Sequence, residues 1–311
     1  MASLPVQQQI CQRIMQLAPH EGYTKSLLDE VRFMRADYPL PRTPVLYDPG
    51  IIIVCQGRKR GYLADRMYRY DAQQFLVLSV PLPFSSETEA TPEEPMLAVA
   101  VRLDMTTVAE LIMLMSEARQ PISDQPEGMI STPLDGSMLD VLNRLLQALM
   151  SPLEAKALGP SLVKELYFRV LMSEQGGAVR AALAYQGHFG RISRALNHIH
   201  AEWQSPLSVA DLASRAGMSV PRFHIHFKTI THTSPLQYIK SVRLHQARLM
   251  MIRSNLPASK TALEVGYESA SQFNREFKRF FGRSPGEEAR MMKQALALLP
   301  PADLERLAIP L

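Results

Sequence analysis

The sequence predicts an α+β protein: an N-terminal β-barrel with following helices, then an all-α C-terminal domain of two helix-turn-helix units joined by a long linker helix. Three observations predict this class. Short apolar segments between turn-forming residues occupy residues 45–103, helical apolar patterns follow them, and one residue pattern recurs 50 positions later near the C-terminus. We place the domain boundary between residues 1–185 and residues 186–311.

Length and composition favour a folded protein of two domains. The chain has 311 residues, of which 46% are hydrophobic and 21% are charged, a balance that is typical of globular proteins and not of disordered ones. No segment approaches the roughly 18 consecutive apolar residues of a membrane helix, and the first residues lack the apolar core of an export signal. We therefore expect a cytoplasmic protein with no membrane partner, in which Cys11 and Cys55 are buried thiols.

Charge is distributed unevenly along the chain. Residues 1–187 carry 17 basic and 21 acidic side chains, a net charge of −4, whereas residues 188–311 carry 17 and 9, a net charge of +8. Seven of the eight histidines also lie in the second part. This asymmetry indicates an anionic partner for the C-terminal part, with nucleic acid as the leading candidate.

The segment at residues 45–103 reads as a small antiparallel barrel or sandwich. Residues 51–57, 61–65, 66–71, 74–80 and 95–103 are rich in β-branched, aromatic and leucine residues, and turn-formers such as Pro49-Gly50 and Gln56-Gly57 separate them.

Helical patterns begin after Asp104. Leu111, Leu114 and Met115 form one apolar stripe, residues 139–149 form a second, and residues 162–172 form a third. Segments at 121–136 and 151–160 contain Pro and Gly and are expected to separate these helices, and the Gly176-Gly177 segment is the expected interdomain linker.

The C-terminal part contains an internal repeat. Six residues recur after 50 positions: Ser219, Phe223, Phe227, Lys228, Ser234 and Pro235 match Ser269, Phe273, Phe277, Lys278, Ser284 and Pro285. Each copy follows a short Ala/Leu-containing helix that ends at glycine, where a positive φ allows a sharp turn. A serine N-cap and two Phe residues four positions apart then predict a second helix with one buried face, which together describe a helix-turn-helix.

Two such units on one chain suit duplex DNA. Residues 236–253 contain no Gly or Pro and predict a helix about 27 Å long, at ~1.5 Å per residue. That length suits holding two recognition helices about one turn of B-DNA apart, roughly 34 Å, so that both enter successive major grooves.

The side chains between the buried Phe residues must face outward and are the expected DNA ligands. Arginine can bond bidentately to guanine and glutamine to adenine, which makes Arg275 and Gln272 the best base readers. Lysines and other arginines are better placed as phosphate ligands, which orient the protein without reading sequence. The phosphate-contacting residues we expect are Lys228, Arg243, Lys278 and Arg279.

The repeat also carries a family resemblance. The segment VGYESASQFNREFKRFFGRSP resembles the second helix-turn-helix signature of AraC/XylS-type transcription regulators, and MSVPRFHIHFKTITHTSPLQYIKSVRLHQARLMM resembles the first unit with its linker helix. The likeness covers about residues 190–292. Upstream, LYDPGIIIVCQGRKRGYLADRMYRYDAQQFLVLSVPLP resembles the cupin-like barrel, of the AraC N-terminal type, of one subfamily of these regulators.

The resemblance implies residue roles and partners. It implies base contacts in the first unit from Pro221, His224 and Ile225, beside which Arg222 also faces outward, and in the second from Ser271, Gln272 and Arg275. It also favours a small-molecule effector, a homodimer, and an effect on promoter occupancy or RNA polymerase contact, with activation and repression both open. The chain departs from the usual pattern at Ile225, where Arg is common, and at His232, where Gly is usual; we therefore expect the second unit to dominate specificity.

Several residues have competing interpretations. His224 and His226 lie two positions apart, on different faces of a helix, so a metal pair is disfavoured, and His20 alone cannot supply the ligands of a metal-binding cupin. Tyr62, Tyr68 and Tyr70 either line an effector pocket in the barrel or form one face of a sheet. The run at residues 58–60, Arg-Lys-Arg, is expected to be a solvated hairpin tip more than an anion site.

No catalytic motif appears in the sequence. GxSxG, GxxxxGK and HExxH are all absent, so we expect neither an enzyme nor a cofactor. The leading hypothesis is a transcription regulator with a sensing barrel. A barrel that serves only for dimerisation, and a cupin-like enzyme with a DNA-binding appendage, are the alternatives.

Overall fold

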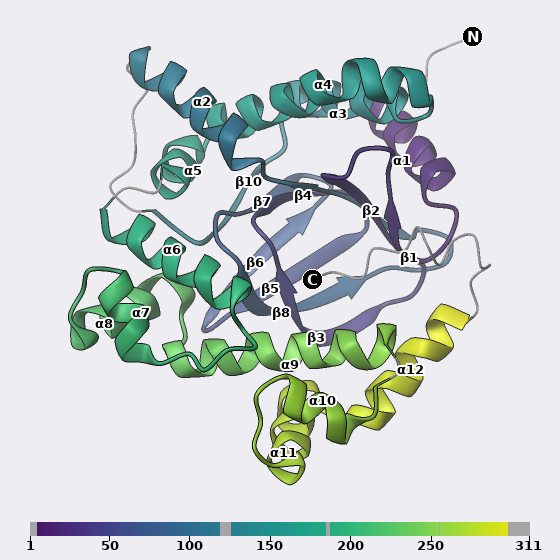
Figure 1. Ribbon diagram of the computed structural model, residues 1–311. Coiled ribbons are helices and arrows are strands. Elements are labelled where there is room, and N and C mark those ends of the chain that lie inside the picture. Colours follow the sequence, from purple (N-terminus) through teal and green to yellow (C-terminus); the bar gives the residue numbers. More distant parts are fainter. Residues whose placement is uncertain (1–4, 119–125, 185–186, 255, 298–311) are drawn as a thin grey trace.

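The computed structural model describes residues 5–118, 126–184, 187–254 and 256–297 (Figure 1). Two antiparallel sheets face each other as a flattened barrel, and a helical region follows it along the chain and packs beside it. The predicted α+β class and the order of its two parts are confirmed. The predicted boundary at residues 185 and 186 lies outside the described residues.

The two sheets contain strands from residues 22–133. The larger sheet has, in spatial order, β1 (Gly22–Lys25), β2 (Val31–Ala36), β9 (Met96–Arg102), β4 (Gly50–Gln56), β7 (Gln74–Leu78) and β10 (Met129–Pro133). The smaller sheet has β3 (Leu40–Tyr47), β8 (Leu82–Glu89), β5 (Arg58–Leu63) and β6 (Arg66–Asp71). The five strands expected from the sequence correspond to β4, β5, β6, β7 and β9.

The turn between β4 and β5 requires glycine. Gly57 has a φ of +72°, and a Cβ atom there would lie 2.9 Å from the Cα of Met96. The run that follows it is not a hairpin tip, as the sequence suggested, because residues 58–60 form β5 itself. Strand alternation points Arg58 and Arg60 outward and Lys59 into the barrel, where only 4% of Lys59 is exposed.

Helices surround the larger sheet and its ends: α1 (Val6–Leu17), α2 (Met105–Glu117), α3 (Gly136–Ala148), α4 (Pro152–Met172) and α5 (Gly176–Leu183). Three expectations are corrected here. Leu114 is 58% exposed, although Leu111 and Met115 of the same predicted stripe are buried. Pro160 lies inside α4, and the Gly176-Gly177 pair begins α5 instead of forming a linker.

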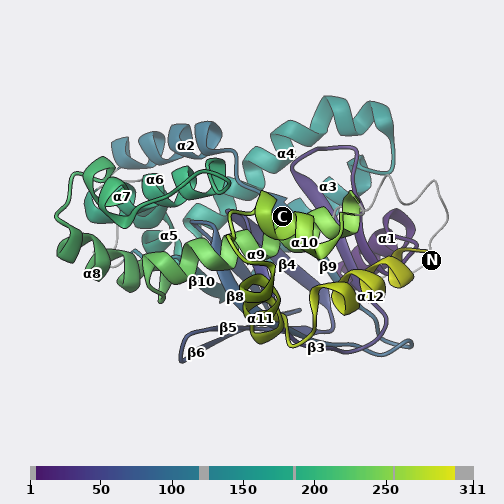
Figure 2. The same ribbon diagram turned by 60° about the horizontal axis from the view of Figure 1, so that its bottom comes forward.

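The remaining helices form the C-terminal region: α6 (Gly187–Ala201), α7 (Val209–Arg215), α8 (Val220–Thr231), α9 (Pro235–Arg253), α10 (Ala258–Glu264), α11 (Ala270–Phe281) and α12 (Pro285–Ala297). Helix α9 runs beside the barrel, with α7 and α8 at one end and α10 and α11 toward the other (Figures 1 and 2). None of the helices that the structure describes is both long and apolar enough to cross a membrane.

The hydrophobic core joins the barrel to the first helix-turn-helix. One cluster fills the space between the larger sheet and helices α1–α5, and another belongs to α9–α12. The cluster between them runs continuously from barrel residues such as Leu78 and Leu82 to Phe223 and Phe227 of α8. The buried Tyr238 hydroxyl of α9 also donates a hydrogen bond to the Pro81 carbonyl, at 2.7 Å, so the two parts are docked against each other.

Candidate nucleic-acid interface

The first helix-turn-helix consists of α7 and α8. Ser208 caps α7 by accepting a hydrogen bond from the backbone N–H of Asp211 at 3.0 Å, and Gly217, with a φ of +61°, turns the chain toward α8. Phe223 and Phe227 are fully buried with their ring centroids 5.4 Å apart. Their burial fixes the rotation of α8, so the residues between them face outward.

The second unit repeats this arrangement in α10 and α11. Gly266, with a φ of +79°, makes the turn, and the Ser269 hydroxyl accepts from the backbone N–H of Gln272 at 3.4 Å. Phe273 and Phe277 are fully buried, with centroids 5.5 Å apart. The structure therefore bears out both units of the repeat that the sequence predicted.

The expected base readers of α8 lie on its exposed side. Pro221, Arg222, His224 and Ile225 are all exposed, and Ile225 keeps 65% of its surface accessible. Such exposure of a branched apolar side chain on a recognition helix suits contact with a thymine methyl group. Lys228 is exposed one turn further along the helix.

Arg222 does not extend freely into solvent. Its guanidinium donates to Nε2 of His188 on α6 at 3.0 Å, and the His188 ring stacks on His226 with centroids 4.1 Å apart. Burial, then the charges of His188 and Arg222, lower the pKa of His226. Because a guanidinium only donates, Nε2 of His188 is the acceptor of this bond.

The expected DNA ligands of α11 form a second exposed surface. Ser271, Arg275, Lys278 and Arg279 are exposed, whereas Gln272 is half-buried. Within the described residues, Arg275 has no hydrogen bond or ion pair and so remains available for a ligand. The amide nitrogen of Gln272 instead lies 3.4 Å from Oε1 of Glu276.

Arg243 is the expected phosphate ligand that the structure contradicts. Its guanidinium donates to the carbonyls of Trp203 and Ser205, each at 3.0 Å, and of Gly266 at 3.4 Å. Burial lowers the pKa of this guanidinium. Arg243 thus fastens α9 to the segment after α6 and to the turn of the second unit, which is a structural role and not the phosphate contact expected from the sequence.

Two polar groups around α11 were not singled out from the sequence. Lys240 of α9 and Tyr267, just before α11, both hydrogen-bond to Glu276 at 2.9 Å. Nothing in the local sequence around either residue indicates this contact. Only the tertiary contact between α9 and α11 reveals that they converge on one carboxylate.

The barrel tyrosines do not line one common pocket. Register pairs Lys59 with Tyr70 and Gly61 with Tyr68, which places Tyr68 and Tyr70 on the inner face, while Tyr62 pairs with Met67 on the outer face. Tyr70 is fully buried, and its hydroxyl lies 3.1 Å from that of Ser86. The three-tyrosine effector pocket is therefore wrong as a group, because Tyr62 faces the other way.

Polar groups also lie within the barrel near Tyr70. The Lys59 ammonium donates to the Thr88 hydroxyl at 2.9 Å, and burial lowers the pKa of Lys59 to about 8. Burying an ammonium group beside a neutral hydroxyl costs desolvation free energy. The periodicity of the sequence did not indicate that Lys59 would be buried.

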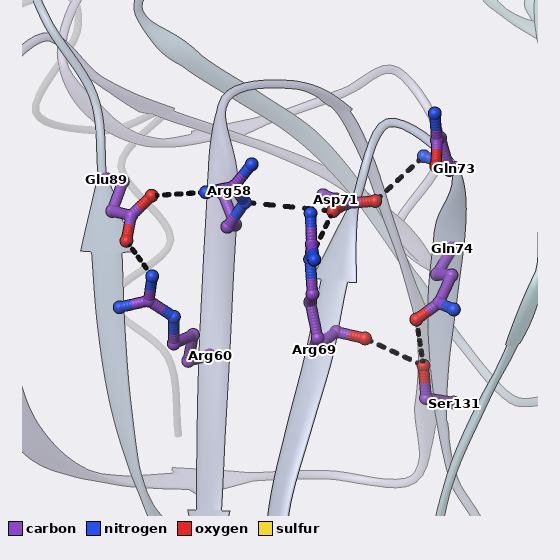
Figure 3. A network of polar contacts seen from close by, with 8 residues as sticks. All are labelled: Arg58, Arg60, Arg69, Asp71, Gln73, Gln74, Glu89 and Ser131. Carbon is purple, nitrogen blue, oxygen red and sulfur yellow. Dashed lines mark hydrogen bonds and ion pairs between the residues drawn. The ribbon is translucent and has the colours of Figure 1, made fainter.

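The outer face of the smaller sheet carries a network of ion pairs (Figure 3). Arg58 contacts Glu89 at 2.9 Å and Asp71 at 3.8 Å, and Arg69 contacts Asp71 at 2.7 Å. Arg60 pairs with Glu89 as well.

Arg58, Arg69, Asp71 and Glu89 also border a large hollow in the N-terminal domain. This open groove of about 730 Å³ lies between α1 and the ends of strands β4, β6 and β8. A smaller crevice, of about 90 Å³, lies beside Tyr23 and Tyr47. Among the described residues, no three His, Cys, Asp or Glu side chains cluster as metal ligands would.

Comparison with known proteins agrees with this arrangement. Residues 27–178 match the family described as the AraC-type transcriptional regulator N-terminus, and residues 212–291 match a helix-turn-helix domain family. The chain is 29% identical over 210 residues to the probable thc operon regulatory protein of Rhodococcus erythropolis, covering 63% of this chain and 62% of that protein. It is 38% identical over 94 residues to the regulator AlkR of Acinetobacter baylyi, covering 30% of this chain and 31% of that one. Both alignments thus span less than two thirds of the relative's own length.

Solved structures share the fold at low sequence identity. A single-residue variant of apo ToxT from Vibrio cholerae superposes with a TM-score of 0.56 at 12% identity, covering 88% of this chain and 99% of that one. Wild-type ToxT bound to an unsaturated fatty acid gives 0.55 at 12% identity, covering 83% and 95%. Because both parts of the chain match their family in the order that the fold shows, the protein belongs to the AraC family of transcriptional regulators.

Proposed function

We propose that the protein is a sequence-specific regulator that binds promoter DNA in the cytoplasm and reads two adjacent major grooves. The observation that carries this proposal is the pair of exposed recognition helices, α8 and α11, attached to the continuous 19-residue helix α9. At ~1.5 Å per residue α9 spans about 28 Å, close to the ~34 Å turn of B-DNA. The surrounding sequence carries the +8 charge that suits a polyanion.

The proposed contacts follow from exposure and chemistry. Base edges are contacted by Pro221, Arg222, His224 and Ile225 of α8 and by Ser271, Gln272 and Arg275 of α11. Lys228, Lys278 and Arg279 bind phosphates. Because Ile225 offers only apolar contact, we propose that α11 supplies most of the hydrogen-bonded discrimination.

Selection of bound duplexes from a randomised DNA library by the full-length protein tests this proposal. The expected product contains two recurring half-sites about 10 base pairs apart, on one face of the duplex. A single half-site, or recovery of unrelated sequences, would contradict bipartite reading. Mapping of bound DNA across the source genome then identifies the promoters.

We propose further that a small-molecule effector acts through the N-terminal domain and shifts the population between two arrangements of the DNA-binding domain. The open groove of about 730 Å³ beside α1 offers a place for such a ligand in this domain. The fatty-acid complex named for ToxT makes an unsaturated fatty acid the first probe, followed by polar metabolites. The alternative is a domain that serves only for dimerisation.

Sedimentation and thermal unfolding of the full-length protein, with and without each compound, separate these alternatives. A ligand that raises the melting temperature and alters DNA affinity supports a sensor. A homodimer whose mass, melting temperature and DNA affinity respond to no compound supports a scaffold. Contact with RNA polymerase is proposed as the route to altered transcription and is tested by transcription reconstituted on a selected promoter.

A further inference from the structure

The carboxylate of Glu276 occupies an unusual place on α11. It lies one residue after the proposed base reader Arg275, yet only 14% of its side chain is exposed. Three donors surround it: the ammonium of Lys240 and the hydroxyl of Tyr267, each at 2.9 Å, and the amide nitrogen of Gln272 at 3.4 Å. These donors come from α9, from the turn before α11, and from α11 itself.

This carboxylate remains ionised at neutral pH. Burial acts to raise the pKa of Glu276, but the hydrogen bonds from Lys240, Tyr267 and Gln272 outweigh it and lower the pKa. An ionised carboxylate only accepts hydrogen bonds. It therefore attracts the NH₂ end of the neighbouring amide and repels its carbonyl oxygen.

Gln272 consequently has one favoured amide orientation. Its Nε2 faces Glu276, so Oε1 is the end of the amide that is left to accept a hydrogen bond from another partner. In the major groove this oxygen can accept a hydrogen bond from N6 of adenine or N4 of cytosine. Guanine and thymine offer acceptors to a major-groove amide, and pairing with them through Oε1 is unfavourable.

We propose that Glu276 is a positioning residue that fixes the Gln272 amide, so that the second unit selects a base bearing an exocyclic amino group. The inference rests on the proposed function, in which Gln272 reads a base edge. Adenine satisfies the arrangement best, because the second N–H of the amide can reach its N7 while the first stays with Glu276. The Tyr267 hydroxyl holds the carboxylate in place through its other oxygen, Oε2, whereas Lys240 ties Glu276 to α9.

The test selects duplexes from a randomised library with the full-length protein and four variants. Gln272→Ala identifies the base position that Gln272 reads, as the one whose preference disappears. At that position the wild type should favour adenine or cytosine over guanine and thymine. In Glu276→Gln the new amide can donate as well as accept, which frees Gln272 to turn, and the preference should fall about fivefold to tenfold.

Two further variants separate orientation from stability. Glu276→Met removes every hydrogen bond and should broaden the same position, so the effect must appear in whichever of the two Glu276 variants keeps a wild-type melting transition. Lys240→Met is the matched control, because it breaks the tie between α9 and α11 but leaves the carboxylate beside Gln272. It should lower the melting temperature and keep the base preference.

Each possible result decides a different claim. An unchanged base preference in a folded Glu276 variant overturns the positioning role. An equal loss of base preference in Lys240→Met also overturns it, because the effect would then come from general stability. A wild-type preference for guanine or thymine at this position also overturns it. If Gln272→Ala leaves every position unchanged, the base-reading role of Gln272 fails, and the inference fails with it.

Discussion

We propose that single exposed residues of α8 and α11 have two different roles, contact with base edges and contact with phosphates. Arg275 is exposed and free of partners among the described residues, so its guanidinium can bond bidentately to guanine. Lys278, one turn further on, is exposed, and we propose that it binds the phosphate backbone as a point charge. Removing each side chain should therefore change DNA affinity in a different way.

Arg275→Ala should cost about 1–3 kcal/mol of binding free energy on the selected duplex and much less on unrelated DNA. Lys278→Ala should weaken binding to all sequences alike and reduce the slope of log affinity against log salt by about one. Titrations of both duplexes at several salt concentrations measure the two effects. Equal losses for Arg275→Ala on both duplexes would make it a phosphate ligand.

His232 is strained where its repeat partner is not. It ends α8 with a φ of +55°, and Gly282, 50 positions later, ends α11 with a φ of +80°. The left-handed conformation costs a non-glycine residue about 1 kcal/mol or more. We expect His232→Gly to raise the free energy of unfolding by about 1 kcal/mol and Gly282→His to lower it by a similar amount, as urea denaturation would show. A destabilised His232→Gly would mean that the imidazole contacts outweigh the backbone strain.

At the scale of elements, the sequence predicted the helices and strands whose buried residues recur at a regular helical or strand spacing. Phe223 and Phe227, repeated at 273 and 277, fixed both recognition helices, and strand β4 is a continuous apolar run. Strand β3 was missed before Val45 because its first residues are exposed and include prolines, and β8 because its second half is polar. Helix α4 continues through Pro160 because its other residues pack against α3, a tertiary effect that local sequence does not contain.

The site residues also divide into those that the local sequence pattern predicts and those that depend on tertiary contacts. The outward positions of α8 and α11 could be predicted because the Phe residues define the opposite face. The roles of Arg243, Glu276 and Lys59 could not be predicted, because a charged side chain is normally solvated. The partners of Arg243 lie 23–40 positions away, the ion-pair partner of Glu276 lies 36 positions away, and the partner of Lys59 lies 29 positions away. Buried charges of this kind are decided by tertiary contacts alone.

The half-buried His200 of α6 and the buried His245 of α9 make stability depend on pH. Burial lowers the pKa of His200 to about 4, and burial, together with the charges of Arg248 and His200, lowers that of His245 to about 3, from an ordinary value of 6.5. The folded state therefore holds both rings neutral, while the unfolded chain takes up protons below about pH 6.5. Their stabilising contribution is complete above that pH and is lost as pH falls toward 4 and 3.

Each histidine should reduce the free energy of unfolding by about 1.4 kcal/mol per pH unit over this range, or about 2 kcal/mol each at pH 5. His245→Phe keeps the edge-to-face contacts with Phe280 and Phe281 and should reduce the slope by about half. Urea denaturation between about pH 7 and pH 5 measures it. A slope that His245→Phe leaves unchanged would place the pH dependence elsewhere.

The whole molecule combines a basic C-terminal region with an acidic N-terminal domain, and one hydrophobic cluster extends through both. The net charges of +8 and −4 attract each other, and the apolar cluster runs without interruption from the barrel into the first helix-turn-helix. The recognition surfaces of α8 and α11 stay exposed in this docked arrangement. The docked arrangement therefore fixes how the first unit is oriented against the barrel without covering either recognition surface.

Gly128 provides a way to weaken that docking. A Cβ atom there would lie 3.1 Å from the carbonyl oxygen of Ile230 in α8, a backbone atom that cannot move aside alone. Gly128→Val should push α8 away from the barrel and release the DNA-binding units, raising affinity for the selected duplex about fivefold or more if DNA requires another orientation. Gly136→Val is the matched control, because a Cβ at Gly136 meets no atom within 4 Å. Fluorescence anisotropy of the full-length variants measures affinity, and a Gly128→Val protein that binds no more tightly than its control would show that the docked arrangement already suits DNA.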